Sequence, residues 1–296
     1  APQDKTGYGA LEHSYSSFYY LPEMNYEPLI KGMIQDVCSH EFLHILTPLN
    51  IHSEEIEDFN FIKPEMSQHL WMYEGITEYF AMLIQVQDSI IDEKEFVNKI
   101  KTKIRSAGEF VPLSFTKMSK EVIKDKYQAH YLDVYQKGAL IALGLDLKLI
   151  ELSKGTRNLK TLMMELAKKY GPNRPFKDDE LIDEIVAMTY PEIRPYFEKY
   201  VVGPDRLPYN DLFNIVGWEF VRDGERKAFS FGSFSLGFNP ETTEIFFVEV
   251  EENTLGLQEN DILVSIEGEN ISAENASTLL GDYLFGKKDD YPINMI

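Results

Sequence analysis

A short segment at residues 40–44, with the sequence His-Glu-Phe-Leu-His, carries side chains that could hold and use a metal ion. On a helix, residues i and i+4 project from one face about 5–6 Å apart, so His40 and His44 can bind the same Zn²⁺. Glu41 would then lie beside the metal, where its carboxylate can take a proton from the attacking water. The alternative is a surface helix that carries these three residues by chance.

A catalytic zinc needs a third protein ligand and one open position. Glu74, in the segment Trp-Met-Tyr-Glu-Gly, is our candidate for that ligand, because a carboxylate suits Zn²⁺ at about 2.0–2.2 Å. We therefore expect one Zn²⁺ per chain. Glu78 follows Glu74 by four residues and shares its helix face, so we expect it to accept the second N–H of a ligating histidine. For both glutamates the alternative is an ordinary solvated helix residue.

The composition of the chain is that of a globular protein and argues against some classes of partner. The chain has 296 residues with 44% hydrophobic and 26% charged residues, which is enough for two domains or one large one. Lys and Arg number 29 and Asp and Glu 49, which gives a net charge of −20 and argues against a nucleic-acid partner. No apolar run reaches the length of about 18 residues that a transmembrane segment needs.

Cys38 is the only cysteine, so no intrachain disulfide can form. This is compatible with the cytosol and does not exclude the bacterial periplasm, so we expect a soluble protein whose compartment the sequence does not fix. The chain starts without methionine and without a signal peptide, which suggests a fragment or a processed product.

Periodicity predicts a helical part followed by a β-rich part. The expected helices cover residues 28–46, 68–87 with Ser67 as N-cap, 93–105, 127–152, 159–169 and 178–188. Extended segments are expected at residues 8–20, 229–238, 245–251 and 261–267. We therefore predict a helical domain over residues 1–206, a linker over 207–228 and a β-rich domain over 229–296.

These motifs together resemble the gluzincin zinc peptidases. Gly9-Ala10-Leu11-Glu12 is similar to the Gly-x-x-Glu exopeptidase motif of zinc aminopeptidases, and residues 135–138, Tyr-Gln-Lys-Gly, to their Tyr-x-Lys-Gly segment. The separation of Glu74 from His44, 74 − 44 = 30 residues, departs from the shorter spacing of the aminopeptidase N family. Taken together with the segment 46–50 and the PDZ-like C-terminal segment, this spacing makes the chain resemble the M61, or glycyl aminopeptidase, family.

The resemblance implies an α+β fold with a mostly helical, thermolysin-like catalytic domain and a small PDZ-like domain, truncated at its end, without the N-terminal β-rich domain of the family. It also implies roles for further residues. Glu12, with Gly9 and Ala10, would bind the substrate at its α-ammonium group, because a fixed carboxylate there selects a free N-terminus. Tyr135 would donate its hydroxyl to the developing oxyanion, although core packing is the alternative for this tyrosine.

The segment 233–238, Ser-Phe-Ser-Leu-Gly-Phe, resembles the carboxylate-binding loop of PDZ domains. A C-terminal peptide is therefore a possible ligand of the PDZ-like domain, the alternative being a packing module that binds nothing.

We predict a zinc aminopeptidase that removes small N-terminal residues, Gly or Ala, from peptides with a free N-terminus; this preference follows from the resemblance alone. Two alternatives stay open. One is a zinc endopeptidase or other gluzincin hydrolase, and the other is a PDZ-type peptide-binding protein with an inert catalytic half.

Overall fold

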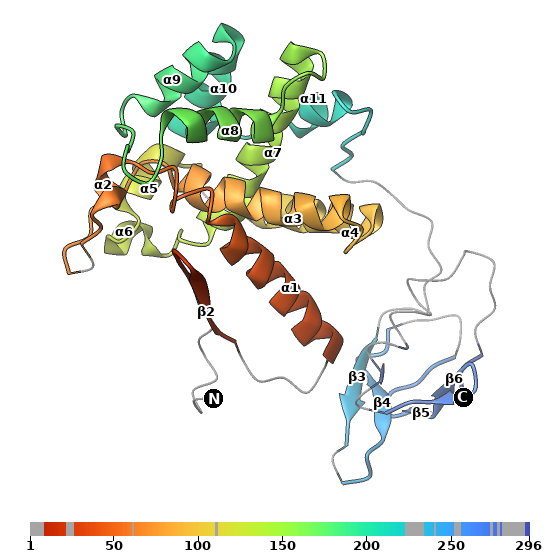
Figure 1. Ribbon diagram of the computed structural model, residues 1–296. Coiled ribbons are helices and arrows are strands. Elements are labelled where there is room, and N and C mark those ends of the chain that lie inside the picture. The colour runs from red at the N-terminus through yellow and green to blue at the C-terminus, as the bar shows by residue number, and fades with distance from the viewer. Residues whose placement is uncertain are drawn as a thin grey trace. The chain divides into compact units, whose positions relative to one another are not determined.

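The computed structural model describes residues 9–21, 27–60, 62–109, 112–222, 234–239, 241–251, 256–272, 275–276, 279 and 294–296. The chain divides into two compact units, Ala1–Val221 and Arg222–Ile296, which we call unit 1 and unit 2. The described residues form a mixed fold of helices and small sheets (Figure 1). None of the helices described is long and apolar enough to cross a membrane.

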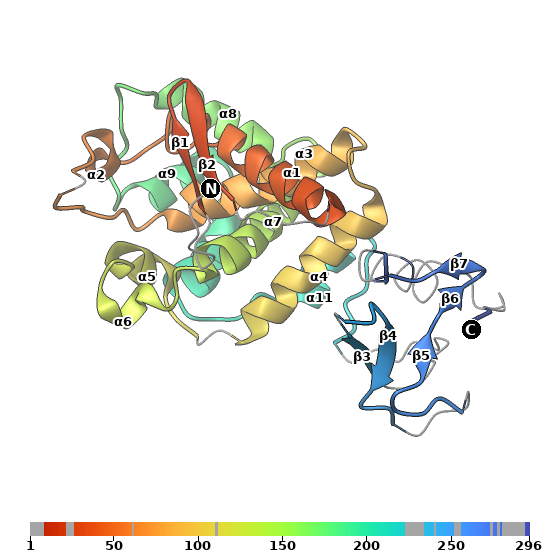
Figure 2. The same cartoon turned by 90° about the horizontal axis from the view of Figure 1, so that it is seen from below.

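Unit 1 starts with a β-hairpin beside a long helix. Strands β1 (Gly9–His13) and β2 (Ser16–Tyr20) pair antiparallel, with Glu12 opposite Ser17. The hairpin lies alongside helix α1 (Glu27–Leu43), as both views show (Figures 1 and 2). The sequence predicted one extended segment here; the two-residue turn at residues 14–15 folds it back on itself, so that Ala10 and Glu12 share a face of the hairpin.

Helix α1 ends three residues earlier than the periodicity predicted. Residues 44–50 form turns, in which the Leu49 N–H donates to the His44 carbonyl at 3.2 Å. Pro48 has no N–H and cannot continue a helix, so the chain leaves the helix directly before His44.

The second expected helix starts late and is irregular. Its first part, η1 (Trp71–Ile76), is a π-helix, and α3 (Thr77–Gln87) continues it as an α-helix. Ser67 does not cap this helix; its hydroxyl donates to Asp178 Oδ1 at 2.5 Å and accepts the His69 N–H at 3.1 Å. The Gln68 N–H donates to Asp178 Oδ2 at 2.8 Å. Asp178 therefore anchors the segment that leads into η1.

Unit 1 contains nine further α-helices and two short helical segments in its described residues. They are α2 (Glu54–Glu57), α4 (Glu93–Glu109), α5 (Phe115–Glu121), α6 (Asp125–Gln128), α7 (Asp133–Ser153), α8 (Leu159–Lys169), α9 (Leu181–Met188), α10 (Arg194–Phe197) and α11 (Tyr209–Asn214), with η2 (Pro191–Ile193) and η3 (Glu198–Val202). The predicted helix at 127–152 is thus two helices separated by turns. Helix α8 has the predicted bounds, and its N-terminus carries a capping box of Asn158 and Thr161.

The predicted linker at 207–228 differs from the structure in its first part. Helix α11 lies there, and Leu207, Leu212 and Phe213 are buried in the core of unit 1. These apolar side chains would be exposed to water in a solvated linker, and packing them against the core of unit 1 is therefore favourable.

The centre of unit 1 is the contact between η1 and α7. Trp71, Met72 and Ile76 are fully buried in the core that α7 also lines. The two backbones touch: a Cβ added to Gly75 would lie 2.5 Å from the carbonyl carbon of Gly138, and one added to Gly138 would lie 2.9 Å from the Gly75 Cα. Only glycine at both positions permits this approach, because real Cβ atoms do not come closer than about 3 Å to backbone.

Unit 2 contains short strands and a small apolar core. Strands β3 (Ser235–Phe238), β4 (Ile245–Val248) and β5 (Ile262–Leu263) form one sheet in that order, and β6 (Ser265–Ile266) pairs with β7 (Glu269–Asn270). Its core includes Ile245, Phe247 and Leu263. Residues 223–233, which include the start of the predicted carboxylate-binding loop, lie outside the described residues.

The glycine contact gives the first prediction. We expect Gly138→Ala to lower the free energy of unfolding by about 2 kcal/mol or more, because a methyl group there overlaps backbone that cannot move aside. Gly32→Ala in α1, where an added Cβ meets nothing within 4 Å, is the control and should stabilise the chain by up to about 1 kcal/mol. Urea unfolding of both variants measures this, and equal stabilities would contradict the backbone contact.

Candidate active site

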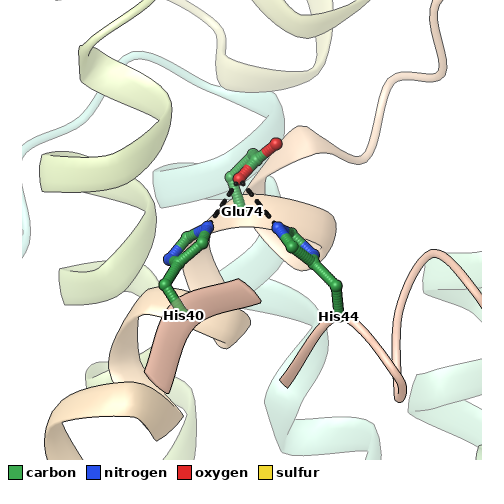
Figure 3. Close-up of side chains that lie close together, drawn as sticks. All are labelled: His40, His44 and Glu74. Carbon is green, nitrogen blue, oxygen red and sulfur yellow. Dashed lines mark hydrogen bonds and ion pairs between the residues drawn. The ribbon is translucent and has the colours of Figure 1, made fainter. Parts of the chain in front are cut away.

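Three predicted ligand residues come together from two segments of unit 1. His40 lies in the last turn of α1, His44 in the turn that follows, and Glu74 in η1, and all three point toward one another (Figure 3). His40 Nε2 lies 3.1 Å from Glu74 Oε2, and His44 Nε2 lies 3.7 Å from the same oxygen. Both histidines are buried.

This arrangement fits a tetrahedral zinc site. Ligands at about 2.0–2.1 Å from one Zn²⁺ lie about 3.3–3.5 Å apart in a tetrahedron, and the two measured separations bracket that value. The ligand atoms of all three residues lie within 4.8 Å of one another. Two imidazole nitrogens and one carboxylate oxygen are also the donor set of many catalytic zinc sites. The residues present therefore fit the ion.

The second nitrogen of each histidine is already engaged. His40 Nδ1 lies 2.8 Å from Glu78 Oε2, and His44 Nδ1 lies 3.0 Å from the Thr47 carbonyl oxygen. A carbonyl only accepts, so His44 Nδ1 carries a proton, and Nε2 is the nitrogen that faces Glu74. The predicted position of Glu78 behind a histidine is therefore the one the structure gives.

Burial and charge set the protonation of this group. Burial alone would lower the pKa of His40, but its hydrogen bonds with Glu74 and Glu78 and their charges raise that pKa to about 10. Burial opposes ionisation of Glu78, yet His40 and Lys103 together lower its pKa to about 2. Burial also opposes ionisation of Glu74, but its hydrogen bond with His40 and the charges of His44 and His40 lower its pKa. Both glutamates are thus carboxylates at neutral pH, and the place between His40 and Glu74 attracts positive charge.

Glu41 lies next to the three ligand residues without a hydrogen-bond partner on one oxygen. Its side chain is buried, with 7% exposed, and Oε2 has no partner among the described residues. Burial raises the pKa of Glu41 against the opposing charges of His44 and His40. An unpaired buried carboxylate oxygen is costly in a protein unless something else fills its place. Glu41 can therefore receive a proton or a cation from a bound molecule.

The predicted substrate-binding residues lie on β1. Glu12 and Glu41 each place a carboxylate oxygen within 4.8 Å of the other and of a His44 nitrogen. Ala10 shares the face of Glu12, and at Gly9 an added Cβ would meet nothing within 4 Å. Among the described strands, β1 pairs with β2 alone, so its other edge has no strand partner.

Two tyrosines line the site, one of which the sequence analysis did not single out. The Tyr135 ring lies 5.6 Å from the His40 ring, and its hydroxyl donates to the Tyr131 hydroxyl at 3.3 Å. Burial and the negative charge of Glu74 raise the pKa of both tyrosines, so both stay protonated. Tyr131 precedes Tyr135 by four residues, which is the spacing that could have indicated it.

The other members of the Tyr-x-Lys-Gly segment have structural contacts. Lys137 Nζ donates to the Leu113 carbonyl at 3.3 Å and lies over the Phe115 ring. Gly138 makes the backbone contact with Gly75. This segment therefore carries Tyr135 and also holds α7 against η1.

Part of the chain matches a known protein family. Residues 33–141 match the model of the M61 glycyl aminopeptidases. The matched range contains His40, Glu41, His44, Glu74 and Tyr135, whereas Glu12 precedes it. The match supports a peptidase.

A solved structure shares the fold. A crystal structure of an aminopeptidase N family protein from Idiomarina loihiensis matches with a TM-score of 0.62 and 21% sequence identity. The match covers 98% of this chain and 56% of that protein, so this chain spans little more than half of its length. The sequence matches none of the curated proteins searched.

Proposed function

We propose that unit 1 is the catalytic part of a zinc aminopeptidase of the M61 type. The observation that carries the proposal is the convergence of His40, His44 and Glu74, with the unpaired carboxylate oxygen of Glu41 beside them. The family match over residues 33–141 supports the same activity. Under this proposal the catalytic domain has a thermolysin-like architecture.

His40 Nε2, His44 Nε2 and Glu74 Oε2 would hold the zinc ion. When bound, Zn²⁺ would polarise the scissile carbonyl and make water a nucleophile at neutral pH. Glu41 Oε2 takes the proton of the attacking water and passes it to the leaving amine, because it lies beside the ligands and forms no competing hydrogen bond within the described residues. Tyr135 donates its hydroxyl to the carbonyl oxygen of the substrate as that oxygen gains charge.

Glu12 would bind the α-ammonium group of the substrate. Its carboxylate lies on the β1 side of Glu41 and His44, so an ammonium held there leaves the first peptide bond near the ligand residues. The backbone of Gly9 and Ala10 on the free edge of β1 would hold the peptide as an added strand. The preference for N-terminal Gly is proposed from the family description, and its extension to Ala from the resemblance of the sequence motifs alone.

Unit 2 would be the PDZ-like domain, and a C-terminal peptide ligand for it stays a prediction from the sequence. A second candidate activity is that of a zinc endopeptidase, which would use the same metal and Glu41 without requiring a free N-terminus. Glu12 separates the two, because only an aminopeptidase needs a carboxylate for an α-ammonium group.

Metal analysis tests the ligand set. We expect about one zinc per chain, lost in His44→Ala and kept in His130→Ala, whose side chain pairs with Asp133 instead. Glu41→Gln should keep the zinc and lose activity by about 10²-fold or more, since it removes the proton acceptor. Full zinc occupancy in His44→Ala would contradict the ligand assignment, and zinc loss in Glu41→Gln would make Glu41 a structural residue.

The two tyrosines form a matched pair for the oxyanion donor. We expect Tyr135→Phe to lower kcat about 10²–10³-fold with little change in KM, because the charged oxygen appears only after substrate has bound. Tyr131→Phe should lower it about tenfold or less, as loss of one neutral hydrogen bond implies. Steady-state kinetics on a free dipeptide measures both; the reverse order of effects would assign the role to Tyr131.

Blocked substrates test the aminopeptidase activity itself. Glu12→Ala should lower kcat/KM on free dipeptides about 10- to 10²-fold, because it removes a charge-assisted contact with the α-ammonium group. Wild-type protein should be nearly inactive on the N-acetylated dipeptides, and Glu12→Ala should discriminate less between the two substrates. Glu12→Gln, which keeps the shape without the charge, is the control and should resemble Glu12→Ala.

Equal cleavage of free and acetylated peptides by the wild type would overturn the aminopeptidase proposal and favour the endopeptidase.

A further inference from the structure

A buried lysine lies behind the candidate zinc site. Lys103, on α4, is 6% exposed, although that helix otherwise presents its lysines to solvent or to partly open positions. Its Nζ lies 2.6 Å from Glu78 Oε1 and 3.3 Å from Gln136 Oε1. Burying an ammonium group is unfavourable unless it is paired, so Lys103 is held there by these two partners.

Lys103 reaches the ligand residues through one carboxylate. Glu78 Oε1 accepts from Lys103 Nζ, and Glu78 Oε2 lies 2.8 Å from His40 Nδ1. The two oxygens thus have different partners, and a rotation of the carboxylate would break both contacts together. The orientation of the His40 ring therefore depends on where Lys103 holds Glu78.

The charge around the site gives Lys103 a second effect. Glu12, Glu41, Glu74 and Glu78 bring four carboxyl groups to the ligand residues and their neighbours. Within the described part of the chain, Lys103 is the only lysine or arginine that forms an ion pair with any of them. Its ammonium group lies against the carboxylate that also contacts His40, so Lys103 holds that carboxylate in place by charge as well as by a hydrogen bond.

Gln136 connects the same lysine to α7. It follows Tyr135 directly, so Lys103 joins α4 to the helix turn that carries the proposed oxyanion donor as well as to α3. Displacement of Lys103 would consequently release contacts on two elements of the site.

We propose that Lys103 is a positioning residue of the zinc site: it fixes Glu78, which orients His40 so that Nε2 points to the metal. The proposal rests on the function proposed above, since it concerns the same ligand set. Its consequence is that the affinity for zinc depends on a residue that contacts neither the metal nor a ligand.

Lys99 offers a matched control. It precedes Lys103 by one helical turn on α4 and lines the same cavity, of about 390 Å³. Its Nζ also lies 2.6 Å from a carboxylate oxygen, Asp36 Oδ2, but the other Asp36 oxygen accepts from Gln85, and among the described residues no side-chain hydrogen bond joins Asp36 to a predicted ligand. The two lysines differ in exposure, 21% of the Lys99 side chain against 7% of that of Lys103, and in whether their carboxylate partner contacts His40.

The experiment measures the dissociation constant of zinc by competition with a chromogenic chelator on the whole chain. We expect Lys103→Met to weaken zinc binding about tenfold, at the lower end of the effect of outer residues on metal sites. Lys103→Arg should recover most of the affinity, and Lys99→Met should stay within about twofold of the wild type. Lys103→Gln keeps a hydrogen-bond donor without the charge and should also weaken zinc binding. Urea unfolding checks that each variant is folded.

A double-mutant cycle with Glu78→Gln tests the path of the effect. If Lys103 acts through Glu78, Lys103→Met should change zinc affinity little in the Glu78→Gln background. The same loss in both backgrounds, or equal affinities of Lys103→Met and Lys99→Met, would overturn the inference. Unchanged zinc affinity in Lys103→Met, with a wild type that binds zinc and cleaves free peptides, leaves the proposed function standing. A wild type that binds no zinc overturns both.

Discussion

The geometry of the site depends on the contact between two glycine backbones. Gly75 directly follows Glu74, and Gly138 lies three residues after Tyr135, so the approach of η1 to α7 sets the distance between these two side chains. A side chain at either glycine would separate the two segments by overlap with backbone. Close packing in protein interiors transmits such shifts instead of absorbing them, so a change at either glycine would also move Glu74 relative to Tyr135. Both motifs end in glycine for this reason.

Four glutamates in one small region have different surroundings, and their chemistry follows from those surroundings. Glu74 accepts from His40, Glu78 lies between His40 and Lys103, and Glu41 is buried with one oxygen that has no partner among the described residues. Glu12 comes from the hairpin and lies near Glu41. The same functional group can thus act as metal ligand, orienting acceptor, base or binding group, because burial and neighbouring charge decide its protonation and its free lone pairs.

The candidate ligand residues could be predicted from the sequence because their spacing is local. The HExxH spacing predicted that His40 and His44 lie side by side; His44 lies in the turn directly after α1, and the two side chains still face the same point. Glu74 and Glu78 repeat the spacing of four residues. Lys103 could not be predicted, since it resembles the exposed lysines of its amphipathic helix and its partner lies 25 residues away. The hairpin turn, the π-helical start of η1 and helices α10 and α11 were also missed. The conformation of each of these segments depends on packing against residues far away in the sequence, and the hydrophobic periodicity of a short window contains no information on such contacts.

The anchor at Asp178 has a consequence for the order in which the site forms. His40, His44 and Glu74 all precede residue 75, but the segment that leads into η1 is tied to a carboxylate more than 100 residues further along the chain. Helices form locally and fast, whereas contacts between distant residues wait for the chain between them to close. A growing chain therefore contains all three ligands long before it can hold them in their final geometry, and the ligand set is completed late in folding.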